Sequence, residues 1–289
     1  MKLINYISDG VVKLGIQLEG GILEVEKLKA GKDLPTNTDE VISGGEAVLK
    51  ELEGLIDSDL ELIPEEEIEY APAVINPSKI LCVGLNYAAH VKEGGKDDRP
   101  LPTAPVWFNK FGSSLIGHKQ KVKRCVLSDQ HDYEAEIVVV IGKKGKYIPK
   151  EEAMDYVFGY TLGNDISARD LQFRSGQWLI GKAADTFGPI GPCIVTADSM
   201  NIENANLIGE KNGEVRQSTN VENMIFDIPT LINDISNIME LNPGDIIFSG
   251  TPEGVIMGRM APLEKDWLQA GDVVKVKSDQ IGELINEIV

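Results

Sequence analysis

The alternation and clustering of apolar positions predict a chain dominated by β-strands. Residues 11–18 and 22–25 flank a Glu-Gly-Gly turn, which predicts a hairpin near the N-terminus. Short runs rich in β-branched residues predict further strands at residues 80–84, 106–108, 136–141, 191–195, 245–249 and 273–277. Because these strands do not alternate regularly with helices, we expect a mixed, curved or barrel-like sheet rather than a doubly wound parallel one.

Fewer segments show the spacing of an amphipathic helix. Residues 44–52, 86–93 and 151–156 predict short helices. A longer helix follows Asp227, which suits an N-cap, and Pro229 lies in its first turn. Pro243-Gly244 ends this helix before the next strand. The predicted fold class is therefore β-rich α+β.

An acidic stretch that contains prolines divides the chain. It begins with Pro-Glu-Glu-Glu at residues 64–67 and continues through Pro72 and Pro77. We therefore expect a small β-rich domain over residues 1–70 and a larger domain over residues 71–289. A chain of 289 residues is long enough for both.

The composition excludes several classes of protein. A net charge of −18 argues against nucleic acid and anionic membranes as partners. No apolar run approaches the ~20 residues that cross a bilayer, and residues 1–6 do not resemble a signal peptide. The three cysteines are widely spaced among apolar residues, which predicts buried free thiols and a cytoplasmic location. No glycine-rich nucleotide-binding motif is present in the sequence, so we expect no nucleotide cofactor.

Two carboxylates stand at the start of the most apolar predicted strand. Glu134 and Glu136 lie on the same face of an extended chain, where they repel each other unless a cation lies between them. Asp165, in an apolar setting, is a third candidate ligand. Three acids without a cluster of thiols or imidazoles predict a hard cation, Mg²⁺ or Mn²⁺. The alternative is that the two glutamates line the wet face of an edge strand.

A histidine and a glutamate share one face of a predicted short helix. His90 and Glu93 are three residues apart, so they can form a hydrogen bond that holds the imidazole as a general base. Residues 94–105 follow as a polar, proline-rich stretch that suits a mobile lid. The alternative is an exposed ion pair. We expect His118 and His131 to be surface or supporting residues.

Two lysines and a tight turn are candidate anion-binding groups. Lys182 stands between apolar and small residues, and a buried lysine needs an anion such as a substrate carboxylate or an enolate. The alternative is a lysine that extends to solvent. Lys110 raises the same question. Thr251 and the backbone N–H groups of the 250–254 turn could hold a carboxylate, or the turn could be a plain connection.

Together these segments resemble the fumarylacetoacetate hydrolase superfamily from about residue 80 to the C-terminus. The matching motifs, in the order of the family, lie at residues 82–87 with His90 and Glu93, 132–136, 160–172, 178–192, 212–217 and 243–255. The resemblance implies a β-roll in the large, catalytic domain and a homodimer. It also implies Mg²⁺ or Mn²⁺ on Glu134, Glu136 and Asp165.

The resemblance further assigns roles to single residues. His90 and Glu93 would form a catalytic dyad on a lid, and Lys182 and Thr251 would contact the substrate. Arg169 and Gln172 would order the site or contact the substrate, and residues 172–178 resemble the branch that includes diketo-deoxy sugar acid hydrolases. Two departures stand out. Leu85 replaces an arginine of some acylpyruvate hydrolases, and a fourth carboxylate ligand is not found, so fumarylacetoacetate is not the expected substrate.

Three hypotheses for the function follow. In the first, the protein hydrolyses a C–C bond of a 2,4-diketo acid, with His90 activating water and Lys182 stabilising the enolate. In the second, the same metal-enolate chemistry decarboxylates an oxaloacetate-type acid or isomerises an unsaturated 2-oxo diacid. In the third, the protein is a ligand-binding or scaffold protein that has kept the fold without the activity.

Overall fold

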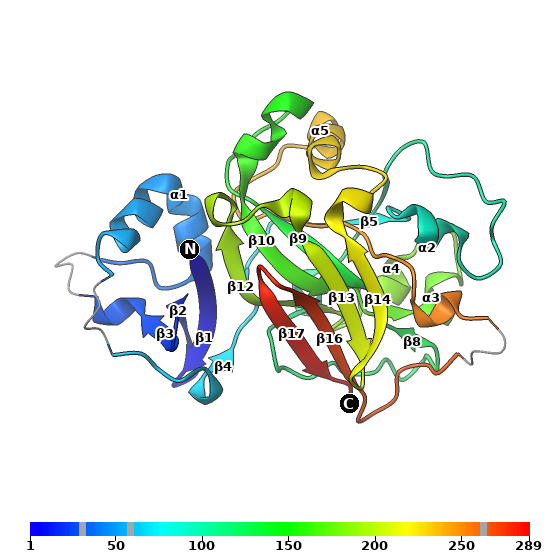
Figure 1. The fold of residues 1–289 in the computed structure, drawn as a ribbon, viewed down its shortest axis with the longest axis horizontal. Helices are drawn as coiled ribbons and strands as arrows, with labels where there is room; N and C mark the ends of the chain where they lie inside the picture. Colours follow the sequence, from blue (N-terminus) through cyan, green and yellow to red (C-terminus); the bar gives the residue numbers. More distant parts are fainter. Residues whose placement is uncertain (29–32, 57–60, 261–264) are drawn as a thin grey trace.

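The computed structural model describes residues 1–28, 33–56, 61–260 and 265–289 (Figure 1). Most of its regular structure is β-sheet, as predicted. The strands of the large sheet are β1 (Lys2–Ser8), β2 (Val11–Leu18), β3 (Gly21–Glu24), β4 (Glu69–Tyr70), β5 (Ile80–Gly84), β6 (Val106–Asn109), β7 (Leu115–Ile116), β9 (Ala135–Ile141), β10 (Val157–Asn164), β12 (Gly188–Thr196) and β15 (Ile246–Phe248).

The strand order of the large sheet is mixed. It runs β3-β2-β1-β12-β10-β9-β15-β5-β6, with β4 beside β1 and β7 beside β12. Most neighbours are antiparallel, but β15 pairs with β5 in parallel. The remaining strands are β8 (His131–Asp132) with β11 (Ser167–Ala168), and a four-stranded sheet of β13 (Asn206–Lys211), β14 (Glu214–Asn220), β16 (Val273–Ser278) and β17 (Gly282–Glu287). The prediction of a mixed rather than doubly wound sheet is confirmed.

Strand β9 is buried on both of its faces. Ile137 and Val139 pack in one core with Val276 of the four-stranded sheet, which lies in front of the large sheet in Figure 1. Val138 and Val140 point into a second core that also contains residues of β1, β2 and α1. Burial on both faces explains why this strand is continuously apolar instead of alternating. It also makes β9 a rigid base for the residues at its start.

The helices lie around the sheets, and they do not alternate regularly with the strands along the chain. They are α1 (Thr38–Glu53), α2 (Ala88–Lys92), α3 (Arg169–Gln172), α4 (Leu179–Lys182) and α5 (Ile228–Ile238), with 3₁₀ turns η1 (Val25–Lys27), η2 (Glu65–Glu67), η3 (Gly112–Ser114), η4 (Lys150–Tyr156), η5 (Ala197–Ser199), η6 (Ile202–Asn204), η7 (Val221–Asn223) and η8 (Ile256–Gly258). Asp227 caps α5 as predicted, accepting a hydrogen bond from the backbone N–H of Thr230. The segment predicted as a helix at 151–156 is a 3₁₀ helix instead.

Helix α1 begins six residues earlier than the predicted 44–52 segment. The side chain of Asn37 caps it by accepting from the backbone N–H of Glu40. Gly45 has a φ of 61°, so the helix is kinked there. A glycine pair inside a helix is unfavourable. The spacing of apolar residues therefore did not predict the turns of α1 before residue 44.

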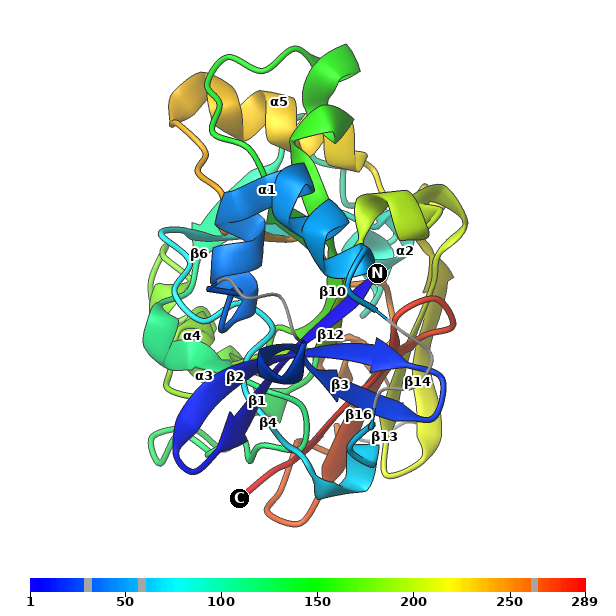
Figure 2. The same ribbon diagram turned by 90° about the vertical axis from the view of Figure 1, so that its left-hand side faces the viewer.

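The N-terminal elements continue the main sheet. Strand β1 pairs with β12 through Lys2 opposite Val195 and Leu3 opposite Ile194. Figure 2, which faces this side, shows α1 packed above the β1–β3 strands. The division at residue 70 stays a prediction, but hydrogen bonds of one sheet cross it.

Both remaining histidines are buried, so of the two expected roles they have the supporting one and not the surface one. His118 and His131 are 4% and 1% exposed. His118 Nδ1 accepts from the backbone N–H of Ile285 at 3.0 Å, and burial lowers its pKa to about 4. His131 Nε2 accepts from the backbone N–H of Cys125 at 2.9 Å. Both rings thus act as neutral acceptors that order the backbone.

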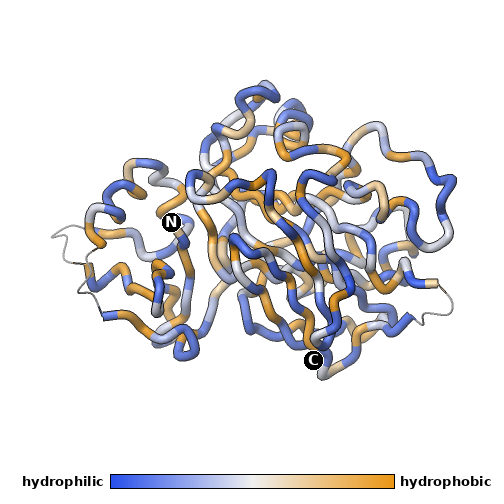
Figure 3. The backbone as a smooth tube through the Cα atoms, in the orientation of Figure 1, coloured by the Kyte–Doolittle hydropathy of each residue, from blue (hydrophilic) through white to orange (hydrophobic). Residues whose placement is uncertain are grey.

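Hydropathy along the backbone follows the burial (Figure 3). Apolar segments lie within the sheets, whereas the loop after α2, at the right of the view, is mostly hydrophilic. None of the helices in the described part of the chain is long and apolar enough to cross a membrane. Cys82 and Cys193 are buried free thiols as predicted, and Cys125 is half-buried.

Candidate metal centre and active site

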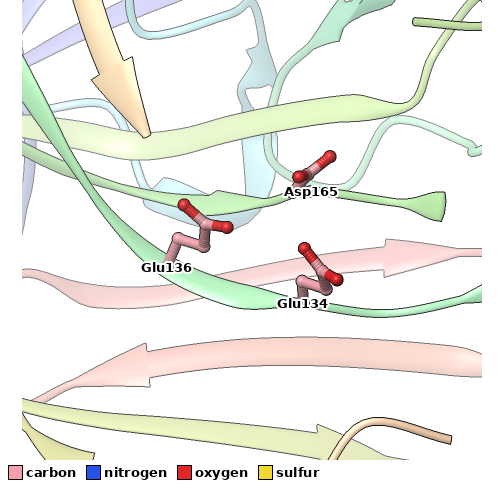
Figure 4. Close-up of side chains that lie close together, drawn as sticks. All are labelled: Glu134, Glu136 and Asp165. Carbon is pink, nitrogen blue, oxygen red and sulfur yellow. The ribbon is translucent and has the colours of Figure 1, made fainter. Parts of the chain in front are cut away.

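Three buried carboxylates converge at the start of β9 (Figure 4). Glu134, Glu136 and Asp165 each offer one oxygen, and these oxygens all lie within 4.8 Å of one another. The three residues are 5%, 1% and 0% exposed. The alternative of a wet edge-strand face is therefore wrong. A set of oxygen donors of this kind suits Mg²⁺ or Mn²⁺.

The pairing of β9 with β10 brings the acids together. Ala135 of β9 lies opposite Asn164 of β10, so Glu134 and Asp165 are neighbours at the end of the ladder. The backbone N–H of Asp165 donates to the carbonyl of Glu134 at 2.9 Å. The backbone N–H of Glu134 donates to the side chain of Asn164, also at 2.9 Å. Because buried strands fix the register, they also fix the spacing of the carboxylates.

Lys182 of α4 lies between two of the acids. Its Nζ is 2.6 Å from Glu134 Oε2 and 2.7 Å from Asp165 Oδ2, and the residue is 2% exposed. The alternative of a lysine that extends to solvent is wrong. The buried ammonium group has the anions that it needs, and they are carboxylates of the protein itself.

Two further cations hold the same acids. Arg169 Nη1 is 2.7 Å from Glu134 Oε1, and Lys110 Nζ is 2.6 Å from Asp165 Oδ1. Lys110 also donates to the carbonyls of Phe187 and Lys182. Lys110 is not among the residues that line the active-site pocket described below. A contact between Lys110 and substrate stays a prediction, whereas its contact with Asp165 is observed.

Burial and neighbouring charges act differently on the three carboxyl groups. Burial raises the pKa of Glu134, but Lys182 and Arg169 outweigh it, so the pKa lies below its usual value. Burial raises the pKa of Glu136 well above its usual value, and the negative charges of Asp165 and Glu134 raise it further. Burial also raises the pKa of Asp165, although its two lysine partners oppose the shift. Glu136 is thus the acid that most needs a cation.

The balance of charge fits a divalent cation at this site. Among the described residues, the network holds four buried carboxylates and three buried cations, namely Asp132, Glu134, Glu136, Asp165, Lys110, Arg169 and Lys182. One negative charge is uncompensated when all are ionised, and Glu136 has no ion pair within the described chain. A divalent ion reverses this sign, so the loaded site attracts an anionic ligand.

The turn after β15 holds groups of the site. The backbone N–H of Gly250 donates to Glu136 Oε2 at 2.7 Å. Thr251 Oγ1 donates to the carbonyl of Ala135 at 3.0 Å and accepts from Gln217 Nε2 at 2.8 Å. The turn therefore binds the carboxylate of Glu136 through the N–H of Gly250, and a contact of Thr251 with a substrate carboxylate stays a prediction. Gln217 also orders β9, a role that its sequence position did not indicate.

His90 and Glu93 form the predicted hydrogen bond. His90 Nδ1 is 2.5 Å from Glu93 Oε1, and the side chains are 9% and 16% exposed, so the alternative of an exposed ion pair is wrong. Glu93 Oε2 accepts from the backbone N–H of Gly254 at 2.9 Å. A Cβ at Gly258 would lie only 2.2 Å from Glu93 Cδ. The 254–258 segment is thus shaped to receive this glutamate.

Asp132 organises another wall of the site. It accepts from the backbone N–H groups of Ile256 and Met257 at 2.8 and 2.9 Å, and from Arg169 Nε at 2.9 Å. Arg169 Nη1 in turn donates to Gln172 Oε1 at 3.0 Å. Arg169 therefore connects Asp132 with Gln172, and a contact of Arg169 or Gln172 with substrate stays a prediction. Asp132 has no predicted role, although it opens the same motif as the two glutamates.

Glu134 of the carboxylate cluster and His90 of the dyad line one pocket. Its empty volume is about 520 Å³, part of it open to solvent. Phe108 and Trp178 form part of its apolar wall. Its polar lining includes His90, Lys96, Arg99, Glu134, Arg169, Gln172, Lys182 and Thr251.

Replacing Lys182 by methionine is expected to destabilise the metal-free protein. The variant leaves Glu134 and Asp165 without the ammonium group that contacts both, so the free energy of unfolding in EDTA should fall by about 3–5 kcal/mol. Saturating Mn²⁺ should reduce this deficit because it supplies positive charge to the same oxygens. Urea denaturation with EDTA or Mn²⁺ measures both effects.

Lys144→Met provides the control for this prediction. Lys144 pairs with Glu240 at 3.0 Å, but both side chains are more than 45% exposed, at 65% and 48%. Loss of such a pair costs about 0–1 kcal/mol. Equal stabilities of the two variants in EDTA would contradict the role given to Lys182.

A family model and a curated relative both match this chain over most of its length. The family model for the C-terminal domain of fumarylacetoacetate (FAA) hydrolase matches residues 79–289. The chain is 38% identical over 294 residues to the mitochondrial oxaloacetate tautomerase fahd2 of Xenopus laevis, covering all of this chain and 90% of that protein.

Solved structures share the fold over the whole chain. Fumarylacetoacetate hydrolase from Exiguobacterium antarcticum has a TM-score of 0.82 and 32% identity, with coverage of 100% and 99% of the two chains. Maleylpyruvate hydrolase from Sphingobium sp. SYK-6, solved with manganese(II) and pyruvate, has a TM-score of 0.80 and 28% identity, with the same coverage. These matches confirm the predicted β-rich α+β fold of the fumarylacetoacetate hydrolase type. The chain, with its buried Glu-Glu-Asp site for a divalent metal, belongs to the fumarylacetoacetate hydrolase family.

Proposed function

We propose that this enzyme catalyses the keto–enol tautomerisation of a short 2-oxo dicarboxylic acid of the oxaloacetate type. The observation that carries the proposal is the pocket that joins the His90–Glu93 dyad to the carboxylate site. A group able to move a proton thus shares a cavity with groups able to stabilise an enolate. The tautomerase activity named for the Xenopus relative supports the choice of reaction.

The residues divide the chemistry between them. A divalent ion held by Glu134, Glu136 and Asp165 would supply Lewis acidity toward the keto group. Lys182 lines the pocket as a buried cation and stabilises negative charge that develops on the keto oxygen. His90, held by Glu93, takes a proton from the carbon beside the keto group. The oxygen takes a proton from solvent to complete the enol, His90 returns its proton to solvent, and no water is consumed.

Hydrolysis of a C–C bond in a 2,4-diketo acid, of the acylpyruvate or diketo-deoxy sugar acid type, is the second candidate. The dyad favours it because an imidazole held by a carboxylate can instead deprotonate water. A solved relative is named maleylpyruvate hydrolase, which shows that the fold supports hydrolysis in that protein. Because both reactions use the same enolate stabilisation, the fold does not select between them.

Three assays on one preparation test the proposal. Enol formation and loss are followed by ultraviolet absorbance with oxaloacetate, pyruvate release from oxaloacetate reports decarboxylation, and acetylpyruvate loss reports hydrolysis. Each is run with Mg²⁺, Mn²⁺ or EDTA. We expect tautomerisation to have the highest kcat/KM and to require the metal. Faster cleavage of acetylpyruvate would replace the first candidate with the second, and no turnover in any assay would contradict both.

The ion, the assembly and the location complete the proposal. We propose Mg²⁺ or Mn²⁺ as the resident ion, and the manganese in the solved maleylpyruvate hydrolase supports this class of cation. The homodimer implied by the family resemblance stays a prediction that light scattering can test. The cytoplasmic location also stays a prediction, and the mitochondrion, named for the Xenopus relative, is the alternative.

A further inference from the structure

The loop of residues 94–105 brings two cations to the active-site pocket. Lys96 and Arg99 both line it, together with His90 and Lys182. Both are exposed, and neither side chain has an ion pair or hydrogen bond within the part of the chain that the structure describes. In a chain with a net charge of −18, unpaired cations beside a pocket indicate an anionic ligand.

The buried cations of the site already have partners. Lys182 lies 2.6 Å from Glu134, and Arg169 lies 2.8 Å from Asp132. A 2-oxo acid that directs its keto end toward these groups presents its other end to the pocket rim. A second carboxylate at that end would meet cations that have no competing acid.

We propose that Lys96 and Arg99 form the subsite for the distal carboxylate of a 2-oxo dicarboxylic acid. This inference rests on the proposed function, since it takes the keto end of the ligand to lie at the metal site. A guanidinium group can hold a carboxylate through two parallel hydrogen bonds, and the ammonium group adds a third donor. The subsite thus distinguishes diacids from monoacids of equal chain length.

The loop is built to hold these two cations together beside the dyad. The backbone N–H of Arg99 donates to the carbonyl of Lys96 at 2.8 Å, which closes a tight turn. Gly94 and Gly95 have φ values of +70° and +75°, and a Cβ on them would lie 3.6 Å from Gly258 and 3.1 Å from Met260. Glu93, one residue earlier, contacts the same segment. The subsite and the dyad are therefore anchored on one piece of chain.

The two acids inside the turn do not oppose this assignment. Asp97 and Asp98 lie between the cations in sequence, but neither is among the residues that line the pocket. The face of the turn that meets the pocket therefore carries positive charge.

Binding to the Mn²⁺-loaded protein and steady-state kinetics together test the subsite, and the binding arm needs no turnover. Calorimetry compares 2-oxoglutarate with 2-oxopentanoate, which carries a methyl group in place of the distal carboxylate, and kinetics compare oxaloacetate with 2-oxobutyrate. We expect the wild type to favour each diacid by about 10- to 100-fold, the value of charge-assisted hydrogen bonds. Lys96→Met and Arg99→Met should each reduce this preference, and the double variant should remove it.

Two further variants provide a charge reversal and a control for the subsite. Arg99→Glu should reverse the preference, because it repels the distal carboxylate. Lys92→Met is the matched control, since Lys92 is exposed on α2 and does not line the pocket; it should keep the wild-type preference. A wild type that binds both acids of a pair equally, or a double variant that keeps the preference, would overturn the proposal. Diacid preference without any turnover would instead refute only the proposed reaction.

Discussion

Glu136→Gln is expected to lower the metal affinity and the activity strongly without weakening the metal-free fold. Glutamine keeps the size of the side chain and the hydrogen bond from Gly250, but it removes one of three ligand charges. The Mn²⁺ affinity should fall by more than the 10- to 100-fold typical for loss of a partner that supports a ligand. Activity should fall on the order of 10³-fold, because Lewis acidity contributes several kcal/mol to a reaction of this kind.

The stability of the metal-free protein should not fall in Glu136→Gln, although its metal affinity does. Glu136 has no ion pair within the described chain, and burial beside Glu134 and Asp165 disfavours its charge. The free energy of unfolding in EDTA should therefore stay the same or rise in Glu136→Gln. Calorimetric titration with Mn²⁺ and urea denaturation in EDTA measure the two quantities.

Glu134→Gln is the matched control at a neighbouring ligand. It also removes a ligand charge, but Glu134 pairs with Lys182 at 2.6 Å and with Arg169 at 2.7 Å. Loss of these buried pairs should lower the free energy of unfolding by about 3–5 kcal/mol. Both variants should thus lose the metal, and only this one should lose stability. Wild-type Mn²⁺ affinity in Glu136→Gln would refute the assignment of the ligands.

His90→Ala and Glu93→Gln are expected to lower kcat by about 10²- to 10⁴-fold, the usual contribution of a general base. His90 of α2 lines the pocket, Glu93 ends the same helix, and neither belongs to the Glu-Glu-Asp cluster. The Mn²⁺ affinity should therefore stay at the wild-type value in both variants. Steady-state kinetics with oxaloacetate and calorimetry with Mn²⁺ separate the two effects.

Gly258→Ala tests whether Glu93 must be held where the structure places it. The new methyl group would overlap the carboxylate of Glu93, and the hydrogen bond from Gly254 would be strained. We expect kcat to fall, which steady-state kinetics with oxaloacetate measure. The single variant Glu93→Asp should retain little activity, because the shorter side chain cannot reach both His90 and Gly254. Full activity in His90→Ala would remove the dyad from the reaction.

The sequence alone determined the strands that carry the site and the identity of its acids. Strand β5 occupies the predicted residues, and β9 extends them by one residue, because a run of β-branched residues buried on both faces leaves few alternatives. The two-residue spacing of Glu134 and Glu136 placed them on one side of the chain without any tertiary information. Local spacing likewise paired His90 with Glu93.

Only the tertiary structure decided how charge is shared among the buried groups and which side chains line the pocket. The partners of Lys182 are 48 and 17 residues away in the chain. Arg169 and Ile256, which contact Asp132, are 37 and 124 residues away from it, so no local pattern reports these contacts. The same holds for Lys96 and Arg99, which are ordinary exposed cations until the loop is seen to line the pocket. Local propensity and periodicity act over a few residues, whereas neutralising a buried charge depends on whichever groups the fold brings within a few ångströms.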